Sequence, residues 1–246
     1  MPMNHEETFD PSFFEQLRKA EEKHFWFSVR RKWIFDELSR LVAPPAKFLE
    51  VGCGTGNVSS FLSRKGYEVT GCEFYPDAIQ GAWPGFRIIQ GDANDLPFSD
   101  KHFDIVGLFD VIEHFQDDMT PLREAVRVVK GGGIVAVTVP AREELWSWFD
   151  EVSLHKRRYT KETLKRMFVE MQLQPLVMKY MFMSLYLPMK YLRSKGETVE
   201  DAFRISRVMN ILLKGLFDGE RLISKGLSLP IGTSLIAIAR KVHCYQ

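Results

Sequence analysis

The chain has 246 residues, of which 45% are hydrophobic. This length can bury a substantial core, and it suits one domain carrying an insertion better than two large domains. The 33 Lys and Arg residues against 32 Asp and Glu leave a formal charge of +1, which argues against the broad positive surface of a nonspecific nucleic-acid binder.

Cysteine usage and apolar segments bear on the cellular compartment. Cys53, Cys72 and Cys244 are too few and too scattered for a disulfide framework or a CxxC metal site, so we predict a reducing cytoplasm and no bound metal. The polar start MPMNHEETFD resembles no signal peptide and predicts no export. The most apolar stretch, Tyr180–Met189, is roughly half of the ~20 residues that a membrane-spanning helix needs, so it could touch a membrane surface but not cross one.

The first half of the chain alternates between helix and strand patterns. Asp10 followed by Pro11 resembles a helix start, and the aromatic HFWF at 24–27 separates this first helix from a second. Runs such as DIVGLFDVI and GIVAVTVP are continuously apolar, as in parallel strands covered on both faces. We therefore predict a doubly wound α/β sheet. The expected helices are 11–22, 28–42, 56–65, 76–82 and 118–130, and the expected strands are 47–52, 68–73, 86–90, 103–109 and 133–139.

The second half is less regular. After Pro140 we expect a loop, a helix from Thr160, a strand at 173–181, a helical region at 183–229 and a last strand at 233–241, antiparallel to the others. The domain prediction is an N-terminal helical lid (1–43), a core (44–182), a helical cap insertion (183–230) and the closing strand of the core (231–246).

The stretch FLEVGCGTGN places glycines where the first strand turns into a helix. Gly52 and Gly54 permit a tight turn and let a ligand approach the main chain. A dinucleotide-binding GxGxxG motif would need glycine where Asn57 stands, and Glu50 ahead of the turn favours a cationic ligand over a pyrophosphate.

Four segments in order, EVGCGTG, GCEFYP, QGDANDLPF and FDIVGLFDVIEHF, resemble class I S-adenosylmethionine (SAM)-dependent methyltransferases. The resemblance implies a Rossmann-like fold, SAM as cofactor and S-adenosylhomocysteine as product. It also implies that Glu73 holds the ribose and that Asp92 and Ala93 meet the adenine. Taken singly, the glycines can relieve steric strain at a turn, Glu73 can be a solvated strand end and Asp92 can form a turn through its side chain. The implied cofactor-binding residues are Glu50, Gly52, Cys53, Gly54, Gly56, Glu73, Phe74, Asp92, Ala93, Asp110, Val111 and His114.

Two histidines follow predicted strands and are candidates for catalysis. Methyl transfer mainly requires alignment and exclusion of water, but a hydroxyl or acidic carbon acceptor benefits from a general base. His114 and His155 are the candidates, although either can instead have a packing role. In the adjacent KRRY, Arg157, Arg158 and Tyr159 could bind a carboxylate or phosphate of the acceptor, or form a solvated turn.

Two further segments bear on the acceptor. HFWFSVRRKWI and LWSWFDEVSLHKRRYT are similar to methyltransferases encoded with glycan- and lipid-modifying enzymes, which implies that the N-terminal helices form a lid and that Trp26 and Arg30 line the acceptor side; core packing is the alternative. The predicted cap has eight basic and five acidic residues, with MNILLKGLF at helical spacing. Such a surface can bind anionic lipid or pack on its own domain.

We therefore predict a SAM-dependent methyltransferase that acts on an O or C atom of a lipid-, quinone- or saccharide-like small molecule. A nucleic-acid methyltransferase is disfavoured by the neutral charge and by DVIEH in place of an N/DPPY motif, and an NAD-dependent oxidoreductase by Asn57. A noncatalytic SAM-binding protein remains an alternative. The sequence predicts a cytoplasmic protein that could contact a membrane surface. It does not identify the individual acceptor, the atom that is methylated or the oligomeric state.

Overall fold

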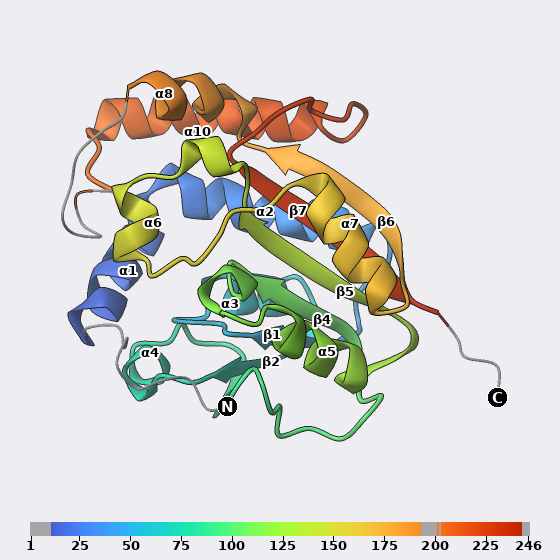
Figure 1. The fold of residues 1–246 in the computed structure, drawn as a ribbon. Helices are drawn as coiled ribbons and strands as arrows, with labels where there is room; N and C mark the ends of the chain where they lie inside the picture. Colours follow the sequence, from blue (N-terminus) through green and yellow to red (C-terminus); the bar gives the residue numbers. More distant parts are fainter. Residues whose placement is uncertain (1–10, 193–200, 202, 243–246) are drawn as a thin grey trace.

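The computed structural model describes residues 11–192, 201 and 203–242, and its centre is one sheet (Figure 1). The sheet has seven strands in the order β3-β2-β1-β4-β5-β7-β6. The apolar runs of the sequence form these strands, which confirms the predicted α/β class. They are β1 (Lys47–Val51), β2 (Glu68–Glu73), β3 (Arg87–Gln90), β4 (Phe103–Phe109), β5 (Val129–Pro140), β6 (Leu173–Met181) and β7 (Ser234–Lys241).

The direction of the last strand matches the prediction. β1 to β5 pair in parallel, whereas β7 is antiparallel to both β5 and β6. β7 lies between β5 and β6 in the sheet. The segment that connects β6 to β7 lies outside the sheet and includes α8 and α10. Parallel strands need helices on both faces to bury their side chains, and β1 accordingly has four consecutive buried residues.

Helices cover both faces of the sheet, with α5 and α7 in front and α2 and α3 behind it in Figure 1. Short 3₁₀ turns lie at η1 (Ile112–His114), η2 (Glu143–Leu145) and η3 (Met183–Leu185). Among the described residues, no helix is both long and apolar enough to cross a bilayer. The helices are α1 (Pro11–Lys23), α2 (Phe25–Ser39), α3 (Asn57–Arg64), α4 (Pro76–Gln80), α5 (Met119–Val128), α6 (Trp148–Val152), α7 (Lys161–Glu170), α8 (Tyr186–Tyr191) and α10 (Arg207–Ile223).

The second helix begins earlier than predicted. Only His24 separates α1 from α2, and the FWF of HFWF forms the first turn of α2. His24 caps this turn, since its Nδ1 accepts a hydrogen bond from the backbone N–H of Trp26 at 3.2 Å. Burial lowers the pKa of His24 to about 4, which keeps the imidazole neutral and able to accept. Asp10, the predicted cap of the first helix, lies outside the described residues.

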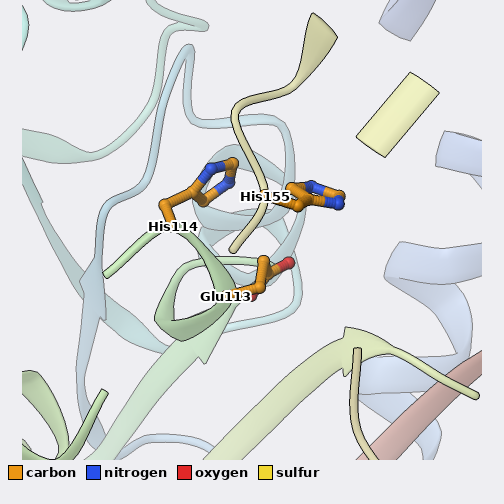
Figure 2. A group of neighbouring side chains, drawn as sticks. All are labelled: Glu113, His114 and His155. Carbon is orange, nitrogen blue, oxygen red and sulfur yellow. The ribbon is translucent and has the colours of Figure 1, made fainter. Parts of the chain in front are cut away.

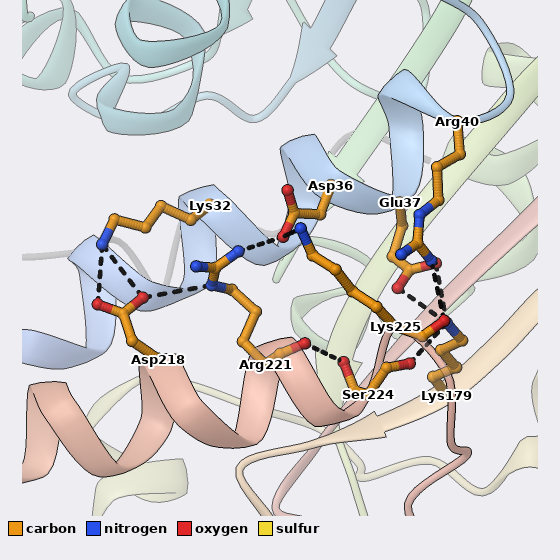
Figure 3. A network of polar contacts seen from close by, with 9 residues as sticks. All are labelled: Lys32, Asp36, Glu37, Arg40, Lys179, Asp218, Arg221, Ser224 and Lys225. Atoms are coloured by element: carbon orange, nitrogen blue, oxygen red, sulfur yellow. Dashed lines mark hydrogen bonds and ion pairs between the residues drawn. The ribbon is translucent and has the colours of Figure 1, made fainter.

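Ion pairs join α10 to α2 across a long separation in sequence (Figure 3). Asp218 of α10 pairs with Lys32 at 2.9 Å, and Arg221 pairs with Asp36. At the end of the network, Nζ of Lys179 on β6 lies 2.9 Å from Oε1 of Glu37. These contacts fix the helix that precedes β7 onto the N-terminal part of the chain.

The Glu37–Lys179 pair permits a stability prediction. Glu37 is 2% exposed, and the ammonium group also donates to the Ser224 carbonyl at 3.1 Å. We expect Lys179→Met to lower the free energy of unfolding by about 3 kcal/mol, because the substitution leaves a buried carboxylate with its main partner removed. Urea denaturation measures this difference.

The matched control is Lys130→Met. Lys130 pairs with Asp104 at 2.6 Å, but both side chains are about a third or more exposed, so we expect a loss of less than about 1 kcal/mol. An equal decrease in the free energy of unfolding in the two variants would show that the buried pair stabilises the protein no more than the exposed pair does.

Candidate active site

A cavity of about 600 Å³ opens at the carboxyl ends of the parallel strands. Open α/β sheets bind ligands at this edge, and the volume falls within the 300–1,000 Å³ that is usual for ligand pockets. Side chains of α1 and α2 complete the wall on the opposite side, among them Phe14, Glu21 and Trp26. The lining is mostly apolar, and its aromatic members are Phe13, Phe14, Phe25, Trp26, Phe27, Phe74, Tyr75, Phe109, Phe115, Trp148, Phe149 and Phe203.

The glycine loop exposes its main chain to this cavity. Gly52 and Gly54 have φ angles of +61° and +54°, which side chains other than glycine rarely adopt. A Cβ atom on Gly52 would lie 2.8 Å from Cγ2 of Val111, whereas one on Gly54 would meet no atom within 4 Å. Gly54 therefore presents open backbone toward the space where a ligand can lie.

Gly56 has a different role from the one predicted. It is the N-cap residue of α3, and a Cβ at this position would collide with the ring of Phe86. Gly56 therefore does not line the cavity, and both its φ of +78° and the adjacent ring of Phe86 favour glycine at this position.

Glu73 joins the end of β2 to the glycine loop. Its Oε2 accepts from the backbone N–H of Gly54 at 2.7 Å, and its Oε1 accepts from those of Phe74 and Tyr75 at 2.8 and 3.0 Å. Burial raises the pKa of this carboxyl, and the three backbone donors act in the opposite direction. A carboxylate offers about four acceptor sites, so Glu73 keeps capacity to accept from a ligand hydroxyl in the cavity.

Two further carboxyl groups lie under the same loop. Glu50 accepts from the hydroxyl of Ser59 at 2.5 Å, and burial raises its pKa to about 7. Glu21 of α1 accepts from Thr55 at 2.5 Å and from the indole N–H of Trp83 at 2.8 Å. Glu21 was not predicted, because no local sequence signal shows that α1 contacts the glycine loop.

The remaining implied cofactor residues lie along the same edge. Asp92 and Ala93 after β3, Asp110 and Val111 after β4, and Cys53 in the loop all line the cavity. Asp92 accepts from the backbone N–H and the side-chain amide of Asn94, at 2.8 and 3.1 Å. The structure therefore brings four separate motifs to one wall.

Arg30 of α2 reaches this wall from the other side. Its Nη2 lies 2.5 Å from Oδ2 of Asp110 and donates to the hydroxyl of Thr138 at 3.2 Å. The guanidinium also lies 5.1 Å from the ring centre of Trp26. Both predicted acceptor-side residues thus face the cavity, and Arg30 is tied to the ends of β4 and β5.

His155 is held by a buried carboxylate. Its Nδ1 lies 2.9 Å from Oδ1 of Asp150, which is fully buried and also accepts two hydrogen bonds from Arg158, at 2.9 and 2.8 Å. Burial would raise the pKa of Asp150, but the bonds from His155 and Arg158 outweigh it and hold the pKa at about 2. Asp150 therefore remains charged and orients the imidazole.

His114 lies against His155, with 4.9 Å between the ring centres (Figure 2). Burial lowers the pKa of His114 to about 3, and the nearby His155 adds to this effect. At neutral pH the His114 imidazole is uncharged, which suits a ligand, whereas a pKa this low makes it a weak general base. Both predicted histidines line the cavity.

Two of the three residues of the basic segment do not reach the cavity. Arg157 donates to Asp118 at 3.1 Å and to the Gln116 carbonyl at 2.7 Å, and the fully buried Tyr159 donates to Asp118 at 2.8 Å. Arg157 and Tyr159 therefore do not line the cavity, and both side chains are engaged with Asp118. Arg158 does line the cavity, but its guanidinium is committed to Asp150.

Glu113 is a cavity residue that the sequence analysis missed. It is fully buried, and neither carboxylate oxygen has a hydrogen-bond partner among the described residues. Burial raises its pKa well above the usual range, and the charge of Asp110 contributes in the same direction. Glu113 belongs to the segment DVIEH, in which the family resemblance implies roles only for Asp110, Val111 and His114.

Known proteins with similar sequences are methyltransferases, which fits a SAM site at this edge of the sheet. Residues 49–137, from β1 to β5, match the methyltransferase domain family. A SAM-dependent methyltransferase of Mycobacterium tuberculosis is 29% identical over 124 residues, covering 49% of this chain and 44% of the relative. Demethylmenaquinone methyltransferases are similar as well: that of Bacillus subtilis is 30% identical, over 50% of this chain and 58% of the relative. The chain thus spans about half the length of the curated relatives that it matches.

Solved structures share the fold across nearly the whole chain. A chain in the complex of the Haloferax volcanii Trm112 methyltransferase activator with its methyltransferase superposes with a TM-score of 0.66 at 18% identity, covering 96% of this chain and 99% of that one. A SAM-dependent methyltransferase of Aquifex aeolicus gives 0.57 at 12% identity, covering 96% and 100%. Residues 49–137 thus match the methyltransferase domain family, and the chain is similar to SAM-dependent methyltransferases, which implies S-adenosylmethionine as its cofactor.

Proposed function

We propose that this protein transfers a methyl group from SAM to an O or C atom of an apolar, aromatic small molecule of the quinone type. The observation that carries the proposal is that one cavity is lined both by the strand-end motifs and by many aromatic rings and two histidines. We refer to the lining around Gly54, Glu73 and Asp92 as the cofactor side, and to the lining around Trp26, Phe149 and His155 as the acceptor side. Similarity to demethylmenaquinone methyltransferases supports a quinone-like acceptor over a saccharide.

The cofactor side fits SAM in chemical terms. Open backbone at Gly54 suits the amino-acid end, and the remaining acceptor capacity of Glu73 suits the ribose hydroxyls. Acidic groups line the wall that a sulfonium would face, including Glu50 and Asp110. When bound, SAM supplies an activated methyl group, and the residues of the cavity have to align the acceptor and exclude water.

The acceptor side contains the group that would activate the acceptor. His155 is oriented by Asp150 through Nδ1, which leaves Nε2 free of hydrogen bonds to the described residues. Trp26 and Phe149 offer flat apolar surface beside it. We propose that the acceptor binds beside His155, where its reacting oxygen or carbon atom loses a proton and becomes nucleophilic, and that α1 and α2 cover the cavity as a lid.

Tritiated SAM tests this function directly. The full chain is incubated with SAM labelled in the methyl group and, in separate reactions, with demethylated naphthoquinols, total lipid, oligosaccharides, RNA and DNA. We expect label in the quinol reaction. Label in RNA or DNA would favour a nucleic-acid methyltransferase. SAM binding with no labelled product, from any of these reactions or from fractionated cell extract, would favour a noncatalytic SAM-binding protein.

The proposal includes peripheral contact with an anionic membrane, where quinones reside. Large apolar side chains on and near α8 and α10 are more than 45% exposed, and the exposed cations Arg207 and Lys214 lie among them. Apolar groups interspersed with positive charge favour the surface of an anionic bilayer. The exposed apolar residues are Leu187, Tyr191, Leu192, Val208, Met209, Ile211, Leu212, Leu216, Leu222 and Ile223.

Sedimentation with vesicles measures this contact. We expect binding to phosphatidylglycerol vesicles that falls with added salt, and weaker binding by the Ile211→Ser/Leu212→Ser double variant, since both side chains are over 60% exposed. The control Val169→Ser removes an apolar side chain of 60% exposure on α7. Equal binding by all three proteins would contradict a membrane role for α10.

A further inference from the structure

We propose that Glu113, His114 and His155 together bind one divalent transition-metal ion at the acceptor side of the cavity (Figure 2). Each residue offers one ligand atom, and the three atoms lie within 4.8 Å of one another. Glu113 and His114 come from η1 at the end of β4, and His155 comes from the loop between α6 and α7. The fold therefore brings two distant segments together at a point that faces the cavity.

The buried carboxyl of Glu113 is the strongest reason for a cation. An unpartnered polar group inside a protein loses its hydration without compensation, and a carboxylate loses the most. Among the charges that act on Glu113, Asp110 and Asp150 disfavour its carboxylate and Arg30 favours it. Arg30 is already paired with Asp110, so the described side chains leave Glu113 without a dedicated counter-charge. A bound cation would provide it.

His155 has the environment of a metal-ligating histidine. Such histidines commonly donate their second ring N–H to a carboxylate, which fixes the tautomer and the ring orientation. Here Nδ1 lies 2.9 Å from Asp150, and Arg158 holds Asp150 in place with two hydrogen bonds. This arrangement directs Nε2 toward a ligand, and the neutral imidazole of His114 lies next to it.

The ligand types select the class of metal. Two imidazoles and one carboxylate suit zinc, iron or cobalt, whereas magnesium and calcium prefer oxygen ligands. Metal–ligand distances of about 2.0–2.2 Å place tetrahedral ligands about 3.4 Å apart, so the three atoms must approach each other by at most about 1.4 Å. Side-chain rotation can supply that movement. Three protein ligands leave a position for a molecule in the cavity, as in catalytic zinc sites.

The site would explain how the acceptor is activated, a role that rests on the proposed function. A bound Lewis acid lowers the pKa of a hydroxyl that coordinates it, so a phenolic or hydroquinone oxygen would lose its proton to solvent near neutral pH. The sequence analysis predicted no metal because it considered cysteine motifs. This site uses nitrogen and oxygen ligands that no short motif joins.

Cobalt titration of the tag-free, chelator-treated chain tests the site. We expect one Co²⁺ per chain, visible d–d absorption and no thiolate charge-transfer band. Glu113→Gln and His155→Ala should each weaken Co²⁺ binding by more than about 100-fold, and Asp150→Asn by about 10–100-fold, since it removes the group that orients the ligand. The control Glu151→Gln changes an exposed glutamate of α6 in the same way and should bind as the unmodified chain does.

Three results would overturn the proposal: no Co²⁺ uptake, uptake that Glu113→Gln leaves unchanged, or a thiolate band that identifies the cysteines as ligands. Circular dichroism and SAM calorimetry on each variant show that a loss of Co²⁺ reflects the site and not unfolding. If Glu113→Gln or His155→Ala fails to fold, Asp150→Asn tests the site instead: Co²⁺ binding weakened by about 10–100-fold would support it, and unchanged binding would contradict it. Co²⁺ binding without methylation of any acceptor would leave the site standing and contradict the proposed function. Methylation that proceeds in chelator, without Co²⁺ uptake, would do the reverse.

Discussion

Replacement of His155 by alanine is expected to lower the rate of methyl transfer by about 10²–10⁴-fold while the SAM dissociation constant stays within about twofold, because the imidazole lies on the acceptor side of the cavity. Its Nδ1 is engaged by Asp150, so Nε2 is the atom directed toward an acceptor or toward a metal ion that activates one. In either case the loss should appear in turnover. The measurement combines single-turnover transfer from labelled SAM with calorimetry of SAM binding.

The matched control for this experiment is His102→Ala. His102 is exposed and lies immediately before β4, away from the cavity wall. We expect both transfer and SAM affinity to be unchanged in this variant. Should His155→Ala reduce turnover and SAM affinity to the same extent, its role would be structural, and the acceptor-side assignment would be abandoned.

Removal of the Glu73 carboxylate is expected to weaken SAM binding by about 1–3 kcal/mol, or about 5–150-fold in the dissociation constant. Two effects add in Glu73→Ala. The charged acceptor for the ribose hydroxyls is lost, and the backbone N–H groups of Gly54, Phe74 and Tyr75 lose their partner. The glycine loop would then be less well ordered before any ligand arrives. Isothermal calorimetry with SAM and with S-adenosylhomocysteine measures the change.

Glu68→Ala is the control for this prediction, since Glu68 begins the same strand and is exposed at its opposite end. It removes the same carboxyl group from β2 without touching the cavity. SAM affinity that Glu73→Ala leaves unaltered would remove Glu73 from the cofactor site. A loss of equal size in both variants would point to the strand as a whole and not to a specific contact.

The positions of the strands along the chain and the position of the cofactor wall could be predicted from the sequence because both follow from local patterns. Continuous apolar runs indicated strands buried on both faces, and β6 has the bounds that were expected, Leu173–Met181. Glycines and acids after successive strands indicated ligand contacts, since the carboxyl ends of parallel strands meet at one edge. Gly54, Glu73, Asp92 and Asp110 do meet there.

Residues with the same local signal were separated by their tertiary contacts. The segment KRRY predicted that three neighbouring residues bind the acceptor. In the structure Arg157 and Tyr159 donate hydrogen bonds to Asp118, whereas Arg158 donates to Asp150. Gly56 matches the glycine motif, but in the structure a side chain at this position would collide with the ring of Phe86. These partners lie far away in the sequence, so no local pattern could distinguish the outcomes.

The sequence by itself determined the sheet, its strand directions and the wall of glycines and acids, because continuous apolar runs and strand-end chemistry are encoded within a few residues. Only the tertiary structure decided which charged groups became paired. Glu21 reached the glycine loop, Arg30 reached Asp110, and Glu113 was buried beside two histidines without a hydrogen-bond partner among the described residues. The physical reason is that the energy of a buried charge depends on neighbours supplied by packing, and the identity of those neighbours is a property of the fold.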